Sequence, residues 1–501
     1  MMVAEKEGKD MSCTTILVGK GASYDGSTMI ARNDDGAYTL KHLKVFEPKD
    51  LPKMYRSVGS KVSIPLHEGA MRFTAMPNAS KEDLKKEGFW AASGVNAANV
   101  GITATETITS NPRVLGADPY VVYQPAKGSK KEVAGGIGEE DIVMLVLPYI
   151  HSAREGVLRL GSLLEQYGTY EPNGICFNDV NEAWYMETIG GHHWIASRVP
   201  DDRVVIMPNQ FGTDTFDLED ALSEGKNYLC SRDLKEFIAD NFLDLSQDGV
   251  LNPRDAFGSH SDADHVYNTP RAWFMGRYLC PHTYRWDGAD ARFTPESDDI
   301  PFALVPEKKV TPEDVKYLLS SHYQGTAYDP YGSYGDPSLR GKYRSIGIAR
   351  TDFMSLIQIR PYMPESYRAL EWVCYGANVF NVMAPLYANV DHAPNYFGKA
   401  DDRVSTDNFH WTSRLIAALA DASYDKSIQE IERYQEKANA KTRSLIHSYD
   451  TSFARESTIQ QREEANETIA KAVQKEADDA LAKILKIRTA DMKNNYSRAD
   501  N

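Results

Sequence analysis

The chain has 501 residues, of which 42% are hydrophobic and 25% are charged, a composition that excludes a mostly disordered or fibrous protein. Lys and Arg number 56 against 71 Asp and Glu, a formal net charge of −15 that disfavours nucleic acid and anionic membrane surfaces as partners. No uninterrupted apolar stretch reaches the length of about 18 residues that a membrane-spanning helix needs. We therefore expect neither a nucleic-acid partner nor a membrane partner.

The start of the chain and its cysteines indicate the cellular compartment in which the protein is expected. Residues 1–12 mix acidic and basic side chains and lack the apolar segment of a secretory signal peptide. The five cysteines form no Cys-x-x-Cys pair, and they are too sparse for a disulfide framework. A reduced, cytoplasmic protein is expected.

Two hairpins are predicted in the first hundred residues after this start. Residues 13–18 have strand composition, a turn follows, and residues 28–32 form a second strand that ends in the polar cluster Asn33-Asp34-Asp35-Gly36. The second hairpin is expected at residues 89–94 and 101–107.

Helices and further strands follow. An apolar helix is predicted at residues 139–147, and a capping box of Ser152 and Glu155 starts the next helix, which Gly168 ends. Thr311, followed by proline and two acidic residues, starts another. Strands are expected at residues 174–177, 183–189, 193–197 and 204–207 and, as a hairpin, at 345–349 and 355–359.

The last hundred residues differ from the rest. Beyond Gly398 the sequence has neither glycine nor proline, and helices are expected at residues 414–446 and 460–487. No low-complexity linker separates domains. We predict one α+β catalytic unit, residues 13–398, with a helical C-terminal extension, residues 399–501, that packs on the body or forms the contact of a homo-oligomer.

Cys13 is the residue whose position points to chemistry. If the Ser12–Cys13 bond is cleaved and residues 1–12 are removed as a leader, one residue carries both a thiol and a free α-amine. An α-amine has a pKa near 8, so it takes the thiol proton and later protonates the leaving amine without a histidine base. The alternative is a buried strand cysteine after a short terminal segment.

The opening motif carries a family resemblance. Residues 13–19, CTTILVG, and 25–36, DGSTMIARNDDG, resemble the start of the dipeptidase A family of lactic-acid bacteria. These are N-terminal-nucleophile (Ntn) cysteine peptidases of family C69, with secernins as relatives. Segments 184–194, 207–210 and 270–274 also resemble the family. The resemblance implies an αββα sandwich and an autoprocessed thiol dipeptidase that forms a thioester acyl-enzyme and needs no metal or organic cofactor.

The wider Ntn group also implies the site residues. Penicillin V acylases and bile salt hydrolases use Cys, Arg, Asp, Asn and Arg, and their sequence contexts assign these roles to Cys13, Arg32, Asp35 (with Asp34 as the alternative), Asn209 and Arg271. This sequence departs from the acylases at residues 105–107, where they have an asparagine, which leaves the second oxyanion donor open.

Each residue type suits its role. Arg32 beside Cys13 favours the thiolate, and Asp35 can orient the α-amine. Asn209 can donate its amide to a tetrahedral oxyanion, and Arg271 can hold a carboxylate of the site or of the substrate. If these residues are purely structural, Arg32 forms an ion pair at a strand end and Asp35 caps a turn. Asn209 is then an ordinary loop residue, and Arg271 forms an ion pair on the surface.

A dipeptide offers an ammonium and a carboxylate, so a selective site presents an acid and a base. Glu106 and Glu187 are the candidates for the ammonium, with an ordinary strand carboxylate as the alternative for each, and Arg271 is the candidate for the carboxylate.

Two other functions stay open: an Ntn amidase or acylase acting on other amides, and a secernin-like interaction protein without catalysis. Residues 260–265 contain two histidines and two aspartates, but no zinc or calcium pattern surrounds them, so we interpret them as a polar loop.

Overall fold

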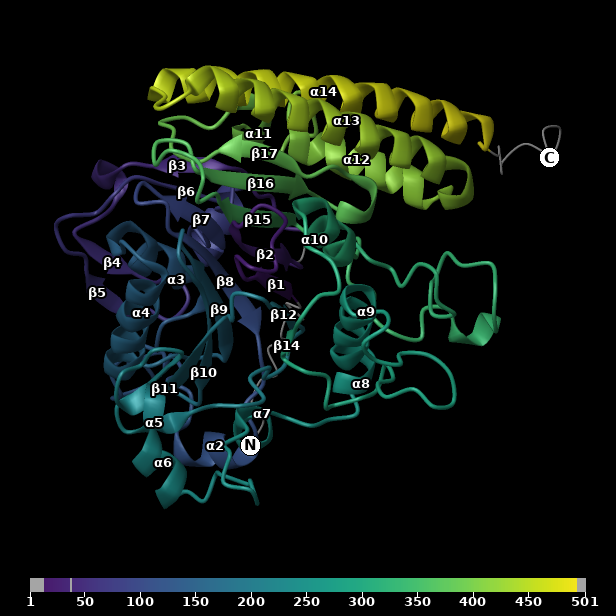
Figure 1. Cartoon of the computed structure of the whole chain (residues 1–501). Coiled ribbons are helices and arrows are strands. Elements are labelled where there is room, and N and C mark those ends of the chain that lie inside the picture. Colours follow the sequence, from purple (N-terminus) through teal and green to yellow (C-terminus); the bar gives the residue numbers. More distant parts are fainter. Residues whose placement is uncertain (1–12, 37, 493–501) are drawn as a thin grey trace.

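Two antiparallel sheets lie face to face in the centre of the computed structural model, which describes residues 13–36 and 38–492 (Figure 1). The expected leader, residues 1–12, lies outside the described residues. Within them, the first sheet has seven strands, in the order β14 (Ala303–Leu304), β12 (Val204–Met207), β1 (Thr14–Val18), β2 (Thr28–Asp34), β15 (Phe353–Ile359), β16 (Ala369–Tyr375) and β17 (Ala384–Tyr387).

The second sheet contains the second predicted hairpin, whose second strand lies at residues 101–107 as expected and whose first strand is Ser93–Asn96 instead of 89–94. Among the described residues it has eight strands, in the order β13 (Tyr228–Cys230), β11 (His193–Arg198), β10 (Ala183–Ile189), β9 (Asn173–Asn178), β8 (Gly101–Thr107), β7 (Ser93–Asn96), β6 (Phe73–Ala75) and β3 (Lys44–Phe46). A separate ribbon pairs β4 (Met54–Arg56) with β5 (Ser63–Pro65).

The alternation of side chains along β1 and β2 explains how the sheets pack. Leu17 pairs with Ile30, and both face the second sheet, where they join Val95 of β7 in one buried cluster. Ile16 and Ala31 point to the opposite face and join the cluster under the helices. Both faces of this sheet are therefore covered, which is why every residue of β1, β2 and β15 is buried.

Helices cover the outer face of each sheet. On the second sheet lie α3 (Glu139–Val146) and α4 (Ala153–Tyr167), which Ser152 caps as predicted. On the first sheet lie α9 (Thr269–Leu279), α10 (Pro312–Leu319), α11 (Asn395–Gly398), α12 (Phe409–Asp421), α13 (Tyr424–Phe453) and α14 (Ile459–Ala490). The layers run helix, sheet, sheet, helix, and the expectation of an α+β protein is confirmed.

Shorter helices occupy the connections between strands. They are α1 (Lys81–Glu87), α2 (Pro112–Ala117), α5 (Leu218–Leu222), α6 (Leu234–Asp240), α7 (Pro253–Phe257) and α8 (Asp264–Tyr267). The last of these, α8, leads through Asn268 into α9.

The C-terminal helices pack on the body. Figure 1 shows α12, α13 and α14 lying across β16 and β17, and Asn466 of α14 exchanges hydrogen bonds of 2.8 and 2.9 Å with the backbone of Tyr387. The single helix predicted at 414–446 is two helices, because the chain turns between Asp421 and Tyr424.

The hairpin predicted at residues 345–349 and 355–359 is wrong in its first strand. Residues 345–349 form turns, and β15 pairs instead with β2 and β16. A local apolar run indicated a strand, but strand pairing over more than 300 residues decided which neighbours β15 has.

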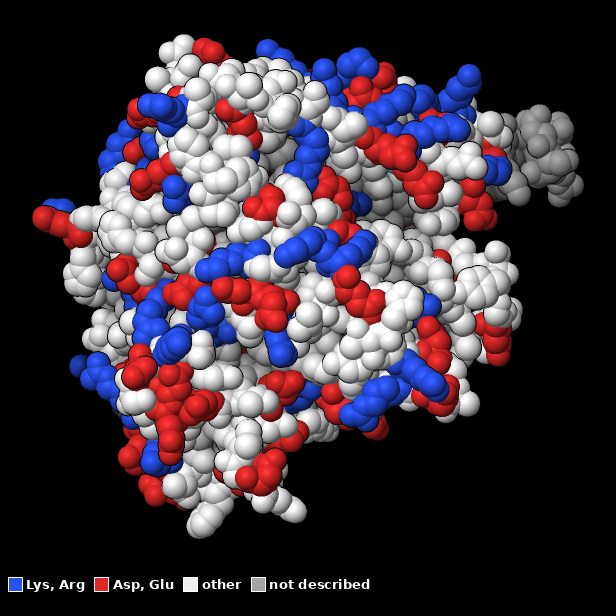
Figure 2. Space-filling view, viewed as in Figure 1, with Lys and Arg blue, Asp and Glu red and all other residues white. Residues whose placement is uncertain are grey.

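The surface agrees with the mixed charge of the sequence. On the face shown in Figure 2, Lys and Arg side chains are interspersed with Asp and Glu. Over residues 13–36 and 38–492, no helix combines the length and apolar character that crossing a membrane requires.

Candidate active site

Cys13 lies directly before β1, at the end of the space between the two sheets, and is completely buried. Its Sγ is 2.7 Å from Nη2 of Arg32, which donates to it. Thr15 pairs with Arg32 across β1 and β2, so the first hairpin itself brings the thiol and the guanidinium together.

Two carboxylates complete the surroundings of Arg32. Its Nη2 is 2.9 Å from Oδ1 of Asp34 and 3.4 Å from Oε1 of Glu139, the first residue of α3. Burial acts to lower the pKa of Arg32, but the Cys13 sulfur and these carboxylates outweigh it and raise that pKa above its ordinary value. Burial raises the pKa of the Cys13 thiol well above its ordinary value, although Arg32 opposes this.

The same groups could be mistaken for a metal site. Ligand atoms of Cys13, Asp34 and Glu139 lie within 4.8 Å of one another. The Arg32 guanidinium contacts all three, and so it already supplies the positive charge that they require.

Arg271, on α9, connects Cys13 to a second set of polar groups. It donates to the carbonyl oxygen of Cys13, to Oγ1 of Thr14 at 2.7 Å and to Oδ1 of Asn209 at 2.7 Å. Its remaining bonds go to Oδ1 of Asn268 and to the backbone of Tyr267, and it has no exposed surface. Burial lowers the pKa of Arg271 to about 9, and the nearby Arg344 acts in the same direction.

Those contacts limit what Arg271 can do. A guanidinium has five N–H donors, and in this conformation each of the three nitrogens of Arg271 is hydrogen-bonded, with five acceptors in total. The geometry therefore makes Arg271 a group that positions Cys13 and Asn209, with no donor left over for the carboxylate of a substrate.

Asn209 follows β12, the strand beside β1. Its Nδ2 donates to the carbonyl oxygen of Thr107 at 2.9 Å, while Asn268 donates to its backbone carbonyl at 3.0 Å. Asn209 is thus held at the end of β8, next to Glu106, by contacts from two separate parts of the chain, β8 and the start of α9.

Asp35 lies just past β2 and is buried. Its Oδ1 accepts from Oγ1 of Thr351 at 2.6 Å, and its Oδ2 pairs with Arg344. It is close enough to act electrostatically on Glu106 and Arg271. Of the two neighbouring aspartates, it is the alternative, Asp34, whose carboxylate contacts Arg32 beside the thiol.

The two candidate glutamates have different surroundings. Oε2 of Glu106 accepts from Oγ1 of Thr15 at 2.7 Å, whereas its Oε1 is buried and has no hydrogen-bond partner in the described structure. Burial raises the pKa of Glu106 to about 8 against the opposing effect of Arg271. Glu187 accepts from the backbone N–H groups of Gly212 at 2.6 Å and Thr213 at 3.3 Å, and so it fixes the loop after β12.

The polar segment at residues 260–265 does not converge on one point. His260 lies 3.6 Å from Asp255, and His265 lies 3.1 Å from Asp298. Asp264 accepts from Asn268 and thereby steadies the group that binds Arg271.

Two site groups escaped the sequence analysis. Glu139 was part of a segment that we interpreted as an apolar helix, and Asn268 had no motif around it. No local signal marks either one, because both reach the site through packing between distant segments. A cavity of about 520 Å³ is connected to the site through Arg344, which lines the cavity together with Tyr38 and pairs with Asp35.

Comparison with known proteins identifies the relatives of this chain. The sequence model of peptidase family C69 matches residues 12–437. A protein named dipeptidase from Bifidobacterium longum is 56% identical over 450 residues, covering 89% of this chain and 84% of that protein. A probable dipeptidase A from Streptococcus pyogenes serotype M18 is 48% identical over 99% of this chain and 100% of its own. Dipeptidase A of Lactobacillus helveticus is 42% identical over 88% of this chain and 89% of that protein.

These matches define the class of the protein. It is a hydrolase of the peptidase type. The chain belongs to peptidase family C69, which confirms the family inferred from its opening motif.

Proposed function

We propose that this protein is a cysteine dipeptidase of the Ntn type, in which Cys13 becomes the N-terminal residue and the nucleophile once residues 1–12 are removed. The contact that carries the proposal is the 2.7 Å approach of Arg32 Nη2 to Cys13 Sγ, at the start of a central strand. The order of layers, helix, sheet, sheet and helix, supports an Ntn αββα sandwich.

Cleavage before Cys13 changes its chemistry. The thiol is buried in the intact chain, and that burial holds its pKa high. A free α-amine on the same residue accepts the thiol proton, and Arg32 stabilises the thiolate that results. Asp35 and Asp34, which flank the site, are the carboxylates proposed to orient the ammonium.

The reaction then runs in two balanced steps. The Cys13 thiolate attacks the scissile carbonyl, and the tetrahedral intermediate expels the amine of the second residue, which takes the proton from the Cys13 ammonium. Water attacks the resulting thioester, with the α-amine as base, and releases the first residue as a carboxylic acid. Sγ and the amine return to their starting states.

Asn209 is proposed to stabilise the oxyanion of both tetrahedral intermediates. Its Nδ2 donates to a backbone carbonyl at the end of β8 and sits in a network centred on Arg271. A shift of this amide from the Thr107 carbonyl to the oxyanion supplies one donor, and a backbone N–H in residues 105–107 is proposed as the second.

Selection of dipeptides is assigned to Glu106. Its Oε1 is a buried acceptor without a partner, and such an atom costs free energy unless a ligand satisfies it. The ammonium of a dipeptide supplies the donor that Oε1 lacks. Glu187 has both oxygens bound to the backbone, so we do not assign it this role.

Further parts of the proposal concern the setting of the enzyme. We propose a cytoplasmic protein that acts as a homo-oligomer, with small peptides as its substrates. The C-terminal helices are proposed to carry the oligomer contact on the side away from β16 and β17.

The intact mass of the purified active protein tests the central claim. We expect the active protein to begin at Cys13. The Cys13→Ala variant should still fold, and it should either retain residues 1–12 or hydrolyse a panel of dipeptides at least about 10⁴-fold more slowly. Active protein that keeps Ser12 on every molecule contradicts the α-amine mechanism. Equal rates on free and N-acetylated dipeptides indicate an acylase, and a Cys13→Ala variant with unchanged activity contradicts catalysis by this residue.

A further inference from the structure

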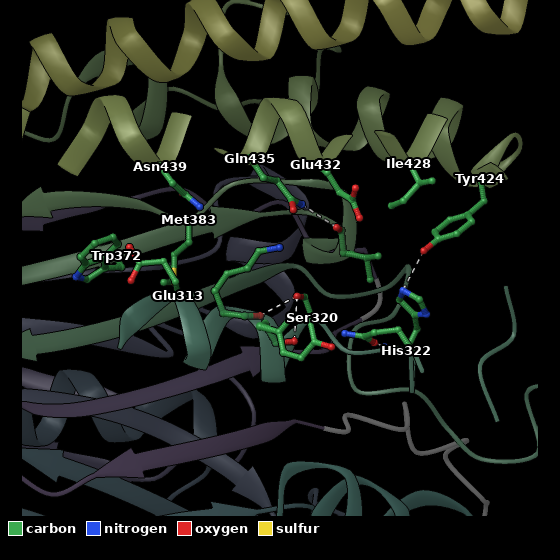
Figure 3. A pocket seen from close by; sticks show the side chains of 14 residues that line it. Glu313, Ser320, His322, Trp372, Met383, Tyr424, Ile428, Glu432, Gln435 and Asn439 are labelled. Carbon is green, nitrogen blue, oxygen red and sulfur yellow. Dashed lines mark hydrogen bonds between the residues drawn. The ribbon is translucent and has the colours of Figure 1, made fainter. Parts of the chain in front are cut away.

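A second cavity lies away from Cys13, between the body and the C-terminal extension. It has a volume of about 350 Å³, at the small end of the range for metabolite pockets. Its walls come from α10, β16, the segment 379–383 and α13, and Figure 3 shows Trp372, Met383, Glu432 and Asn439 around it. The cavity contributes nothing to the chemistry proposed for the active site.

One wall presents an unusual cation. Lys316, on α10, lines the cavity, and within the described part of the chain its Nζ has no ion pair or hydrogen bond. Burial lowers the pKa of Lys316 to about 8, and the only group that acts in the opposite direction is the thiol of Cys374. A partly desolvated ammonium without a carboxylate is costly, so the cavity is suited to an anion.

The acceptors of the cavity come from α13. Nε2 of Gln435 donates to the carbonyl oxygens of Val379 and Asn381, at 2.9 and 3.2 Å, which leaves its Oε1 as an acceptor (Figure 3). Glu432 adds a carboxylate from the same helix face, one turn earlier. The second carboxylate of the cavity, that of Glu313, is already bound by Arg443 at 2.7 Å.

The rest of the lining combines an apolar part with neutral polar groups such as Ser320, Gln324 and Asn439. Trp372, Val379, Met383 and Ile428 supply hydrophobic surface. A doubly charged phosphate or sulfate is best held by several cationic donors, whereas Lys316 is the one Lys or Arg side chain among the described residues that line this cavity. The set fits a single carboxylate with an apolar side chain and a nearby positive charge.

We propose that this cavity binds a free apolar α-amino acid, with its carboxylate on Lys316, its ammonium toward Glu432 and Gln435 Oε1, and its side chain against Trp372 and Met383. The bound molecule would connect α10 to α13 and so fasten the C-terminal extension to the body. The site is separate from the proposed peptidase function, and binding is measured without turnover.

Calorimetric titration of the full chain with three probes tests the assignment. L-leucine is compared with 4-methylpentanoate, which lacks the amine, and with 3-methylbutylamine, which lacks the carboxylate. We expect leucine to bind at least tenfold more tightly than either analogue. Absence of leucine binding, or an analogue that binds as tightly as leucine, overturns the proposal.

Variants locate the binding. Lys316→Met removes the charge at nearly constant length and should weaken leucine binding at least tenfold, whereas Lys316→Arg should retain most of it. Lys471→Met, an exposed lysine of α14, is the matched control and should change nothing. Leucine is also a product that a dipeptidase active site could hold. Unchanged affinity for leucine in Lys316→Met therefore places the binding elsewhere and overturns the proposal.

Glu432→Gln tests the ammonium contact. It should weaken the binding of leucine but leave the binding of 4-methylpentanoate unchanged, and equal effects on both ligands exclude the ammonium contact.

Discussion

Strands β1 and β2 pass through two contrasting regions of the space between the sheets. At one end, Leu17 pairs with Ile30 in a fully apolar cluster. Two residues along the same face, Thr15 pairs with Arg32, and the space contains a thiol, a guanidinium and buried carboxylates. The same strand geometry therefore serves a packed core and a polar centre.

The difference between them lies in what stabilises each region. The apolar end gains free energy directly from burial, by roughly 25 cal/mol for each Å² removed from water. The polar end loses free energy on burial, and only mutual contacts among its charges offset the loss. The polar end therefore depends on every member of its network, whereas the apolar end loses free energy in step with the apolar volume that is removed.

Replacing Arg32, the cation at the centre of the polar end, should have the largest effect on activity and stability. Arg32→Met leaves Asp34, Glu139 and Cys13 without their shared partner. We expect kcat/KM for a dipeptide to fall about 10³-fold and the free energy of unfolding to fall by about 3 kcal/mol. The loss of stability should be smaller at pH 5 than at pH 8, because Glu139, whose pKa is already raised by burial, can be protonated there.

An exposed arginine provides the control for that experiment. Arg433 pairs with Glu430 on the surface of α13, and Arg433→Met should change stability by less than about 1 kcal/mol. If Arg32→Met were as mild as Arg433→Met in both rate and stability, the polar end would not depend on its cation.

Truncation at the apolar end should separate stability from activity. Leu17→Ala leaves a cavity between the sheets, and we expect the free energy of unfolding to fall by about 2–5 kcal/mol. The rate per folded molecule should stay within about threefold of the original, because the side chain belongs to the apolar cluster and supplies no hydrogen bond or charge to the polar network. Denaturant unfolding and active-site titration measure the two effects, and a large loss of rate per folded molecule would show that the two ends are coupled.

Glu106→Gln should give the smallest and most specific change. The pKa of Glu106 is raised to about 8 in the folded protein, against an ordinary carboxyl value near 4.5 in the unfolded chain. Between these values the folded state binds the extra proton, so wild-type stability falls as pH rises through this window. Glu106→Gln removes that decline, and its stability relative to wild type should increase from pH 5 to pH 8.

The same variant tests recognition of the substrate ammonium. N-acetylation of a good dipeptide should cost wild type most of its kcat/KM, and Glu106→Gln should reduce that penalty about tenfold. Glu187→Gln is the matched control, because Glu187 is equally buried but bound to the backbone; it should lower stability and leave the penalty unchanged. An identical N-acetyl penalty in Glu106→Gln and wild type argues against the ammonium contact.

Much of the local structure follows from the sequence alone. Ser152 and Thr311 cap their helices as predicted, because a capping residue and its backbone partners lie within three positions of each other. Only half of the capping box predicted for Ser152 forms, since the Glu155 carboxylate accepts from the backbone N–H of His151 instead. The meeting of Cys13 with Arg32 is equally local, since one hairpin joins them. The opening motif also identified the family, and the sequence model of that family confirms it.

Only the tertiary structure decided which distant groups complete the site. Glu139 reaches Arg32, Arg271 reaches the Cys13 carbonyl and Asn268 reaches Arg271 because two sheets and their covering helices bring separate segments into contact. The roles of Glu106 and Glu187 diverge for the same reason: both are strand carboxylates in the sequence, yet one has an unsatisfied oxygen near Cys13 and the other binds a loop. Hydrogen bonding is short-ranged and directional, so its partners are fixed by packing in three dimensions, whereas caps and strand alternation are fixed by neighbours along the chain.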